Sequence, residues 1–225
     1  MWLRPVKAWG IQIQNHTILP SYFTKSSIVL IMVGVVLCGG QSTRMGTDKG
    51  LLKSYANTWA EAAANKLKAL ALDIKISINT KQFGNYSNIF PVEILIADND
   101  SLKIKGPLCG ILSVHIQHPS QDLLVLACDM LLLETEILEE LLAYYRLHPD
   151  AEAIVFTNAN EPEPLCGIYR AKGLTHIHHL YKKGQLPNYS MKNVLESIST
   201  FLIPLSMDKT KLFSNFNTQA ERNDL

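Results

Sequence analysis

Hydrophobic positions along the chain follow two different periods, and these predict strands and helices in alternation. Continuous apolar runs at 28–38 and 123–128 are typical of strands that are buried on both faces of a sheet. Further strand segments are predicted at 74–78, 92–96, 153–157, 165–169 and 200–205. Helical spacing of apolar residues occurs at 57–70 and 137–145, and a third helix is expected after Gly106-Pro107. This order predicts an α/β fold with a mainly parallel sheet and helices on both faces.

The composition narrows the class of protein that this fold can serve. With 225 residues, of which 47% are hydrophobic and 18% charged, the chain suits one large ordered domain. Its net charge of +1 gives no general attraction for nucleic acid or for an anionic membrane. The apolar run at 28–38 is shorter than the roughly 20 residues that cross a bilayer. We therefore expect neither nucleic acid nor a membrane as a partner.

The cysteine pattern indicates a reducing compartment. The four cysteines lie far apart and form no Cys-x-x-Cys pair, and they are Cys38, Cys109, Cys128 and Cys166. Small buried thiols in a reduced state are the simplest interpretation, so a cytoplasmic protein is expected.

The chain is expected to divide at two places. Residues 1–31 precede the first strong strand and are predicted to be an N-terminal extension of unknown role. Residues 32–225 are then expected to form a single domain. Within it, the segment Glu161-Pro-Glu-Pro164 is predicted to be a loop, which separates a first half at 32–160 from a second half at 161–225.

Residues 35–49, Val-Val-Leu-Cys-Gly-Gly-Gln-Ser-Thr-Arg-Met-Gly-Thr-Asp-Lys, carry the strongest chemical signal. A strand breaks into Gly39 and Gly40, and glycines let backbone N–H groups approach a ligand closely. Such N–H groups form a concavity that suits phosphate oxygens. Arg44 and Lys49 can then neutralise a polyphosphate. The segment, called the glycine loop below, therefore predicts a nucleoside triphosphate site.

Two better-known phosphate loops do not fit this segment. The P-loop spacing is not met, because five residues separate Gly40 from Gly46 and a threonine follows. The dinucleotide pattern Gly-x-Gly-x-x-Gly is also not met. A charged surface turn is the plain alternative, but one surface turn has no need of this many glycines, hydroxyls and charges together.

Asp129 follows the apolar strand at 123–128, in Ala-Cys-Asp-Met. Ligands of open α/β sheets collect at the carboxyl ends of strands. One carboxylate beside a phosphate loop suits Mg²⁺, which takes one or two carboxylates together with phosphate oxygens. The alternative is that Asp129 caps the next helix. The glycine loop favours the metal role.

Other polar residues at strand ends are weaker candidates. Asn79 and Asp98 each follow a predicted strand, where turn residues are the default but where a ligand rim is also expected. Gly106-Pro107 would begin a helix, and plain helix entry is its alternative role. The histidines at 176, 178 and 179 resemble a metal cluster, but a solvated helix face is favoured for them and for His115 and His118.

The motifs together resemble one family, the molybdenum cofactor guanylyltransferases, which make molybdopterin–guanine dinucleotide. The segment Leu-Cys-Gly-Gly-Gln-Ser-Thr-Arg-Met-Gly-Thr-Asp-Lys is similar to the family's opening motif. Gly-Pro-Leu-Cys-Gly at 106–110 and Ala-Cys-Asp-Met at 127–130 resemble its second and third motifs. Pro-Leu-Cys-Gly at 164–167 and the tail Phe-Ser-Asn-Phe-Asn-Thr at 213–218 are similar to later segments. The resemblance runs in the family's order from about Val33 onward.

The resemblance implies a Rossmann-like three-layer α/β/α fold with a mainly parallel twisted sheet, of the nucleotide-diphospho-sugar-transferase type. It implies binding of GTP, with Mg²⁺ on Asp129. The implied nucleotide contacts are Leu37, Cys38, Gly39, Gly40, Lys49, Asn79, Asp98 and Asp129, and the implied second-substrate contacts are Gly106, Pro107, Asn215 and Asn217. Arg44, Lys49 and Asp129 are the expected catalytic residues. Two departures stand out: Leu131 replaces the usual proline after Asp129, and the segment 55–59 lacks the usual Gly-Lys-Pro turn.

The expected reaction is transfer of GMP from GTP to molybdopterin or Mo-molybdopterin, with release of pyrophosphate. Two alternatives stay open. One is a sister enzyme that uses CTP or couples another nucleoside triphosphate to a phosphate. The other is a non-catalytic module that binds pterin or nucleotide, against which the intact Arg44, Lys49 and Asp129 argue. Transient contacts with other enzymes of molybdenum cofactor synthesis are expected as well.

Overall fold

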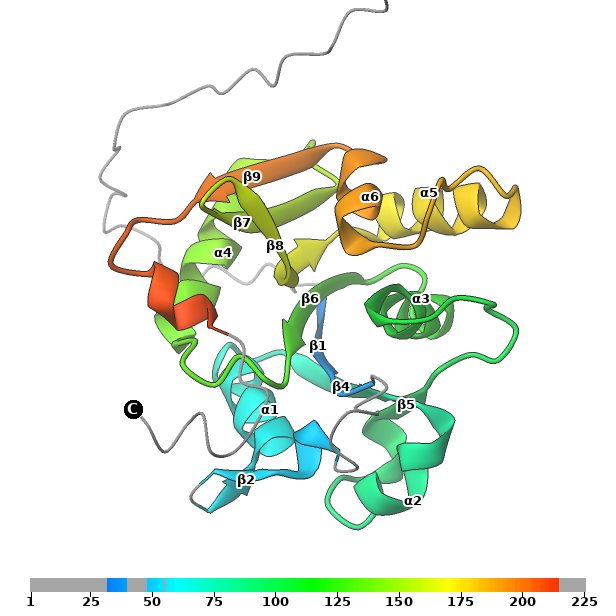
Figure 1. Ribbon diagram of the computed structural model, residues 1–225, viewed down its shortest axis with the longest axis vertical. Helices are drawn as coiled ribbons and strands as arrows, with labels where there is room; N and C mark the ends of the chain where they lie inside the picture. Colours follow the sequence, from blue (N-terminus) through cyan, green and yellow to red (C-terminus); the bar gives the residue numbers. More distant parts are fainter. Residues whose placement is uncertain (1–31, 40–47, 55, 215–225) are drawn as a thin grey trace, which may run out of the picture.

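The computed structural model describes residues 32–39, 48–54 and 56–214, and a seven-stranded sheet organises them (Figure 1). The strand order is β5-β4-β1-β6-β8-β7-β9. The strands are β1 (Met32–Leu37), β4 (Asp73–Ile78), β5 (Leu95–Ala97), β6 (Asp122–Ala127), β7 (Ala153–Asn158), β8 (Glu161–Tyr169) and β9 (Thr200–Pro204). Only the pairs that β8 forms with β6 and β7 are antiparallel in this sheet. The predicted mainly parallel sheet is confirmed.

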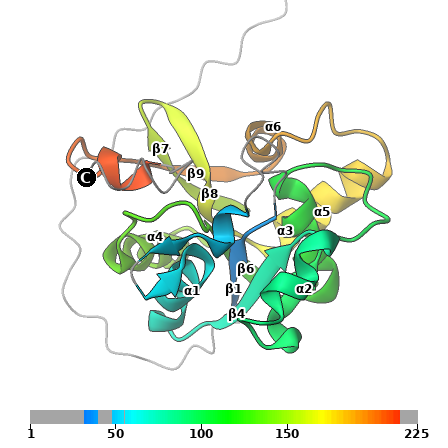
Figure 2. The ribbon, with the colours of Figure 1, turned by 60° about the horizontal axis from the view of Figure 1, so that its bottom comes forward.

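Helices cover both faces of the sheet, which gives the predicted three layers (Figure 2). One face packs against α1 (Trp59–Ala69), α4 (Thr135–Leu147) and the short α2 (Phe83–Tyr86). The other face packs against α3 (Pro107–Gln117), α5 (Ala171–Lys182) and α6 (Met191–Glu196). The short 3-10 helices are η1 (Lys49–Leu51), η2 (Thr80–Gln82), η3 (Val92–Ile94) and η4 (Thr210–Phe213), and β2 (Lys53–Ser54) pairs with β3 (Asn57–Thr58). The Rossmann-like α/β/α architecture follows from this layering.

Helix α1 shows how local sequence and packing agree. Thr58 and Glu61 form a reciprocal capping box, in which the Thr58 hydroxyl accepts from the Glu61 N–H at 3.2 Å and the Thr58 N–H donates to the Glu61 carboxylate at 2.7 Å. Trp59, Ala63 and Leu67 recur at helical spacing and are buried against the sheet. The apolar period alone was therefore sufficient to predict this helix and its buried face.

The segment from Val92 to Ile96 was predicted to be one strand, and this was wrong for its first half. Val92–Ile94 forms η3, and the strand begins only at Leu95. Pro91 precedes the turn with φ of −55°, and its carbonyl accepts from the Ile94 N–H at 3.2 Å. Pro91 is the N-cap and lies outside the turn, with ψ of 138°. The hydrogen bond from Ile94 to its carbonyl closes the 3-10 turn, so this N–H is not available to a strand ladder.

The predicted loop at Glu161–Pro164 is also wrong, because these residues begin β8. Ala159 and Asn160 have positive φ values of 47° and 68° and turn the chain directly back. Asn158 then pairs with Glu161 and Thr157 with Pro162, beyond a register shift in β7. A strand tolerates proline where the ladder is irregular, and that context is invisible in the sequence.

The four cysteines are buried and free, as expected. His176 and His179 are exposed on α5, but His115 is only 3% exposed, so the expected solvated position is wrong for His115. Its Nε2 lies 3.2 Å from the Thr175 hydroxyl, because α3 packs against α5. Among the described residues, no helix is long and apolar enough to cross a membrane.

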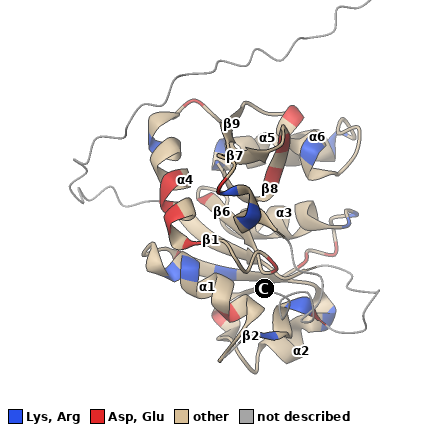
Figure 3. Cartoon of the chain, turned by 60° about the vertical axis from the view of Figure 1, so that its left-hand side comes forward, with Lys and Arg blue, Asp and Glu red and all other residues tan. Residues whose placement is uncertain are grey.

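Acidic residues lie along α4 and basic residues along α1, and Figure 3 shows the two helices on the same side of the sheet. Both signs of charge are thus present on neighbouring elements. This mixture of charges agrees with the net charge of +1.

Candidate active site

Four neighbouring strands end at the same edge of the sheet and carry the candidate polar residues. β5 is followed by Asp98, β4 by Asn79, β1 by Cys38 and Gly39, and β6 by Cys128 and Asp129. The four strands are adjacent and parallel, so their carboxyl ends lie in one row (Figure 1). This row is where open α/β sheets bind their ligands.

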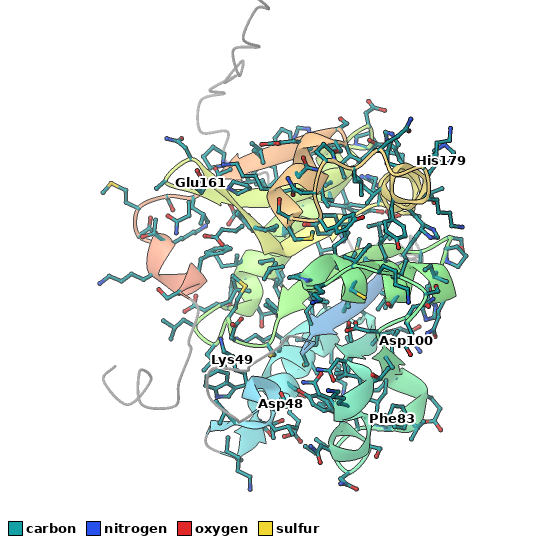
Figure 4. All side chains as sticks on the ribbon, turned by 45° about the vertical axis from the view of Figure 1, so that its right-hand side comes forward. Asp48, Lys49, Phe83, Asp100, Glu161 and His179 are labelled. Carbon is teal, nitrogen blue, oxygen red and sulfur yellow. The ribbon has the colours of Figure 1, made fainter. Side chains whose placement is uncertain are left out.

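A pair of opposite charges in this row joins the glycine loop to β6. The Nζ of Lys49 lies 3.5 Å from Oδ2 of Asp129. Their side chains are 25% and 22% exposed, so the pair is partly desolvated and still accessible to a ligand. Lys49 is the first residue of η1 and directly follows the N-cap Asp48. Figure 4 labels both residues.

A half-buried lysine on α1 holds the turn that carries Asp129. The Nζ of Lys66, on α1, donates to the carbonyls of Met130 and Leu131 at 3.2 and 2.8 Å. The Met130 carbonyl also accepts from the Leu133 N–H at 3.4 Å. Burial lowers the pKa of Lys66 to about 8. Leu131 has no proline ring to fix its φ, and these contacts supply a restraint on the turn after Asp129.

Asp98, Asn79 and Gly39 form a second group at the same edge. A Cβ on Gly39 would lie 3.7 Å from the Asn79 nitrogen and 3.8 Å from Oδ2 of Asp98. Burial and the nearby charge of Asp100 raise the pKa of the Asp98 carboxyl, while a hydrogen bond with the Cys109 thiol lowers it. Asp98 thus connects β5 to the first turn of α3.

Several backbone groups near the glycine loop are already engaged within the fold. The N–H groups of Cys38 and Gly39 both donate to the Ser77 carbonyl, at 2.9 and 3.0 Å. The Leu37 carbonyl accepts from the Cys128 N–H at 3.2 Å. In this arrangement the Gly39 N–H is directed into the sheet rather than toward a phosphate. For Leu37, Cys38 and Gly39, the described structure therefore supports only a position close to the site.

Asn79 has a local structural role that the sequence left open. Its side-chain oxygen accepts from the N–H groups of Lys81 and Gln82, at 3.0 and 3.2 Å, and so caps η2. Oε1 of Gln82 accepts in return from the Asn79 N–H at 2.8 Å. The spacing Asn-x-x-Gln is a capping-box pattern, and this signal could have been found in the sequence.

Gly106 and Pro107 lie at the start of α3, whose first turn reaches Asp98 through Cys109. Gly106 has φ of 87°, a conformation that favours glycine, and Pro107 occupies the first turn. A Cβ at Gly110 would collide with the Ser77 hydroxyl, so glycine lets α3 approach β4 closely. The motif thus has a clear structural reason, and its second-substrate role stays a prediction. Arg44, Gly40, Asn215 and Asn217 lie outside the described residues.

The donor set fits a metal that shares its coordination with a nucleotide. No group of three or more His, Cys, Asp or Glu side chains in the described ranges could hold an ion by itself. Asp129 offers one partly exposed carboxylate beside Lys49. Mg²⁺ commonly takes one or two protein carboxylates and completes its shell with phosphate oxygens and water. Asp129 could therefore hold Mg²⁺ together with a bound triphosphate.

The fold and this row of residues define a nucleotide-dependent transferase, and comparison with known proteins identifies the family. Residues 34–200 match the model of the MobA-like NTP transferase domain. The chain therefore belongs to that family and is a nucleotidyltransferase. Its relatives include a probable molybdenum cofactor guanylyltransferase of Flavobacterium johnsoniae, 28% identical over 84% of this chain and 94% of the relative. A protein of the same name from Methanothermobacter thermautotrophicus is 32% identical over 81% of this chain and 92% of the relative.

Solved structures agree with this fold. Molybdopterin-guanine dinucleotide biosynthesis protein A from Archaeoglobus fulgidus superposes with a TM-score of 0.68, covering 86% of this chain and 96% of its own, at 21% identity. CMP:2-keto-3-deoxy-manno-octonic acid synthetase, solved with CTP, gives a TM-score of 0.60, covering 86% and 95%, at 13% identity. These likenesses confirm the nucleotide-diphospho-sugar-transferase type of fold.

Proposed function

We propose that the chain transfers GMP from GTP to molybdopterin or Mo-molybdopterin, with Mg²⁺ as the metal. The observation that carries this proposal is the Lys49–Asp129 pair at the carboxyl edge of the sheet. The guanylyltransferase relatives support the choice of guanine and pterin, since each is matched over most of its length.

Lys49 and Asp129 have complementary tasks in this proposal. Lys49 binds phosphate oxygens as a cation and stabilises the charge that develops at the transferred phosphorus. Asp129 holds Mg²⁺, which supplies charge neutralisation on the triphosphate. The 3.5 Å separation means that the two groups can act on neighbouring oxygens of a single triphosphate. Arg44 is proposed as a further cation from the same loop.

The reaction needs little proton transfer. A terminal phosphate oxygen of the pterin attacks the α-phosphorus of GTP, a new P–O bond forms, and the bond between the α-phosphorus and the bridging oxygen breaks. Pyrophosphate leaves with that electron pair. The attacking phosphate is already an anion at neutral pH, so positioning and charge stabilisation provide most of the rate enhancement.

We infer a division of labour along the sheet, with residues 32–160 binding GTP and residues 161–225 binding the pterin together with Gly106 and Pro107 from the first half. Gly106, Pro107, Asn215 and Asn217 are the proposed second-substrate contacts, and Leu37, Cys38, Gly39, Gly40, Asn79 and Asp98 the further nucleotide contacts. The strand β8 begins at Glu161 and runs within the same sheet, so one continuous sheet would serve both halves. Free buried thiols support a cytoplasmic location, where transient contacts with other enzymes of the pathway would occur.

The decisive experiment incubates the purified protein with GTP, MgCl₂ and molybdopterin and identifies the dinucleotide by mass. Parallel reactions with CTP, ATP and UTP measure pyrophosphate release. Release that is highest with GTP supports the proposal, whereas higher release with CTP replaces guanine by cytosine. Asp129→Asn should abolish turnover. Absence of turnover with every triphosphate, together with tight pterin binding, would favour a non-catalytic module.

A further inference from the structure

The two described ends of the glycine loop meet at one side chain, that of Gln82. The loop is entered at Cys38 and left at Asp48. Nε2 of Gln82 donates to the Cys38 carbonyl at 3.1 Å and to Oδ2 of Asp48 at 2.6 Å. Gln82 itself lies on η2, the element after β4, so a separate part of the chain joins both ends.

Both N–H groups and the oxygen of the Gln82 amide have hydrogen-bond partners in this position. Its two N–H bonds serve Cys38 and Asp48, and its oxygen accepts from the Asn79 N–H at 2.8 Å. The orientation of the amide is the one that the partners allow, because a carbonyl and a carboxylate need donors and an N–H needs an acceptor. One amide therefore ties the glycine loop to the end of β4.

The Asp48 carboxylate is equally occupied. Its Oδ1 accepts from the Gly50 N–H at 3.0 Å and from the Tyr86 hydroxyl at 3.1 Å, while Oδ2 accepts from Gln82. Three donors to one carboxylate fix it strongly. Asp48 is thus an anchor for η1, whose first residue is Lys49.

We propose that Gln82 is a positioning residue for the transferase reaction. Through Cys38 and Asp48 it sets the separation of the two ends of the glycine loop, and so it places the Lys49 ammonium against Asp129. This inference rests on the proposed function, because Lys49 must bind the triphosphate for its placement to matter. Errors of about 1 Å in such placement reduce rates by roughly 100-fold.

The test exchanges donor and acceptor between the two partners. Gln82→Glu keeps the acceptor for Asn79 but sets a carboxylate against the Asp48 carboxylate and the Cys38 carbonyl. We expect it to raise the KM for the triphosphate at least about tenfold, with a smaller effect on kcat. Asp48→Asn alone should have a similar effect, because two amide N–H groups then face each other.

The double variant Gln82→Glu, Asp48→Asn restores the pairing with reversed polarity. The amide introduced at position 48 can donate to the carboxylate introduced at position 82, and its oxygen can still accept from Gly50 and Tyr86. The Cys38 carbonyl still lacks its donor in the double variant, so we expect a KM below that of Gln82→Glu but above that of wild type, a non-additive result that independent sites would not give. Calorimetric titration with a non-hydrolysable analogue of the triphosphate should show the same order of affinities.

Tyr145→Phe is the matched control. It removes a 2.7 Å hydrogen bond to Asp122 at the amino end of β6, away from the row of strand ends. We expect a lower unfolding temperature and an unchanged KM. Tyr86→Phe removes one of the donors to the Asp48 carboxylate and should raise the KM about threefold. This variant tests the same anchor if the Gln82→Glu protein does not fold.

The outcomes separate the two proposals. Turnover of CTP in place of GTP would refute the proposed function, and the same variants assayed with CTP would still test Gln82. Equal KM and equal analogue affinity in wild type, Gln82→Glu and Tyr86→Phe would overturn the positioning role. A double variant no better than the single variants would overturn it as well.

Discussion

The Lys49 ammonium lies 3.5 Å from the Asp129 carboxylate, although 80 positions separate the two residues in the chain. Parallel strand order makes this contact, because β1 and β6 are neighbours and end together. The contact joins the cation of the glycine loop to the carboxylate proposed to hold the metal. Both groups are partly exposed, so a bound triphosphate can reach them.

Removal of either partner should impair the transferase reaction. Lys49→Met is expected to lower kcat/KM for GTP by roughly 100-fold or more, because a charge-stabilising contact is lost. Asp129→Asn should lower it at least as much at every magnesium concentration. Steady-state kinetics with GTP and molybdopterin measures both, and the double variant should lose less than the product of the two effects. Full turnover by Asp129→Asn would rule out its metal role.

Lys66→Met should change stability in a pH-dependent way. The native pKa of Lys66 is about 8, against 10.5 for the unfolded chain, so the unfolded chain binds more protons between these values. Protonation at Lys66 therefore opposes folding below about pH 8, and this cost disappears as the pH rises toward 10.5. The free energy of unfolding of wild type minus that of Lys66→Met should rise across this window, by at most about 3 kcal/mol.

Urea unfolding of both proteins at several pH values measures this difference. Lys68→Met, on an exposed side chain of the same helix turn, is the control and should show no such trend. A constant difference between wild type and Lys66→Met from below pH 8 to about pH 10 would contradict the lowered pKa. The loss of donors to Met130 and Leu131 should also lower kcat/KM, by about tenfold.

Asp98→Asn should make the protein more stable and weaken its binding of GTP. Burial and Asp100 raise the pKa of Asp98, so the native state takes up a proton more readily than the unfolded chain. The charged carboxyl is therefore destabilising near neutral pH, and its cost falls as the pH falls toward the native pKa. We expect Asp98→Asn to unfold at a higher temperature than wild type at neutral pH and to bind GTP more weakly.

Asp100→Asn provides the matched comparison for Asp98. It removes the neighbouring like charge and leaves the Asp98 carboxylate in place. It should raise stability slightly and leave the KM for GTP unchanged. Thermal unfolding followed by circular dichroism, with the same kinetic assay, decides the point, and unchanged GTP binding in Asp98→Asn would remove Asp98 from the nucleotide site.

Ala159→Gly should stabilise the protein. Ala159 has φ of 47° in the turn between β7 and β8, a conformation that costs a residue with a Cβ but not glycine. We expect a gain of about 0.5–1 kcal/mol in the free energy of unfolding, measured by urea denaturation. Ala153→Gly, in the buried part of β7, should instead destabilise by roughly 1 kcal/mol. A loss of stability in Ala159→Gly would contradict the turn conformation.

The strands and helices could be predicted where one period dominated. The predicted runs at 28–38 and 123–128 correspond to the central strands β1 and β6, and the spacing of Trp59, Ala63 and Leu67 predicted α1. Prediction failed at Val92, where a 3-10 turn replaces the strand, and at Glu161, where a tight turn at Ala159 and Asn160 begins a longer strand. It also failed at His115, which α5 covers. In each case the deciding partner was a local turn or a distant element rather than the hydrophobic period.

The sequence by itself determined the class of fold and predicted the chemistry of the glycine loop, because periodicity and residue type are local properties. It indicated Lys49 and Asp129 as separate candidates. Only the tertiary structure decided that they meet at 3.5 Å, that Lys66 holds the turn after Asp129, and that Gln82 joins Cys38 to Asp48. These contacts depend on the order of strands in the sheet and on helix packing. Neither the strand order nor the packing is encoded in the spacing of residues along the chain.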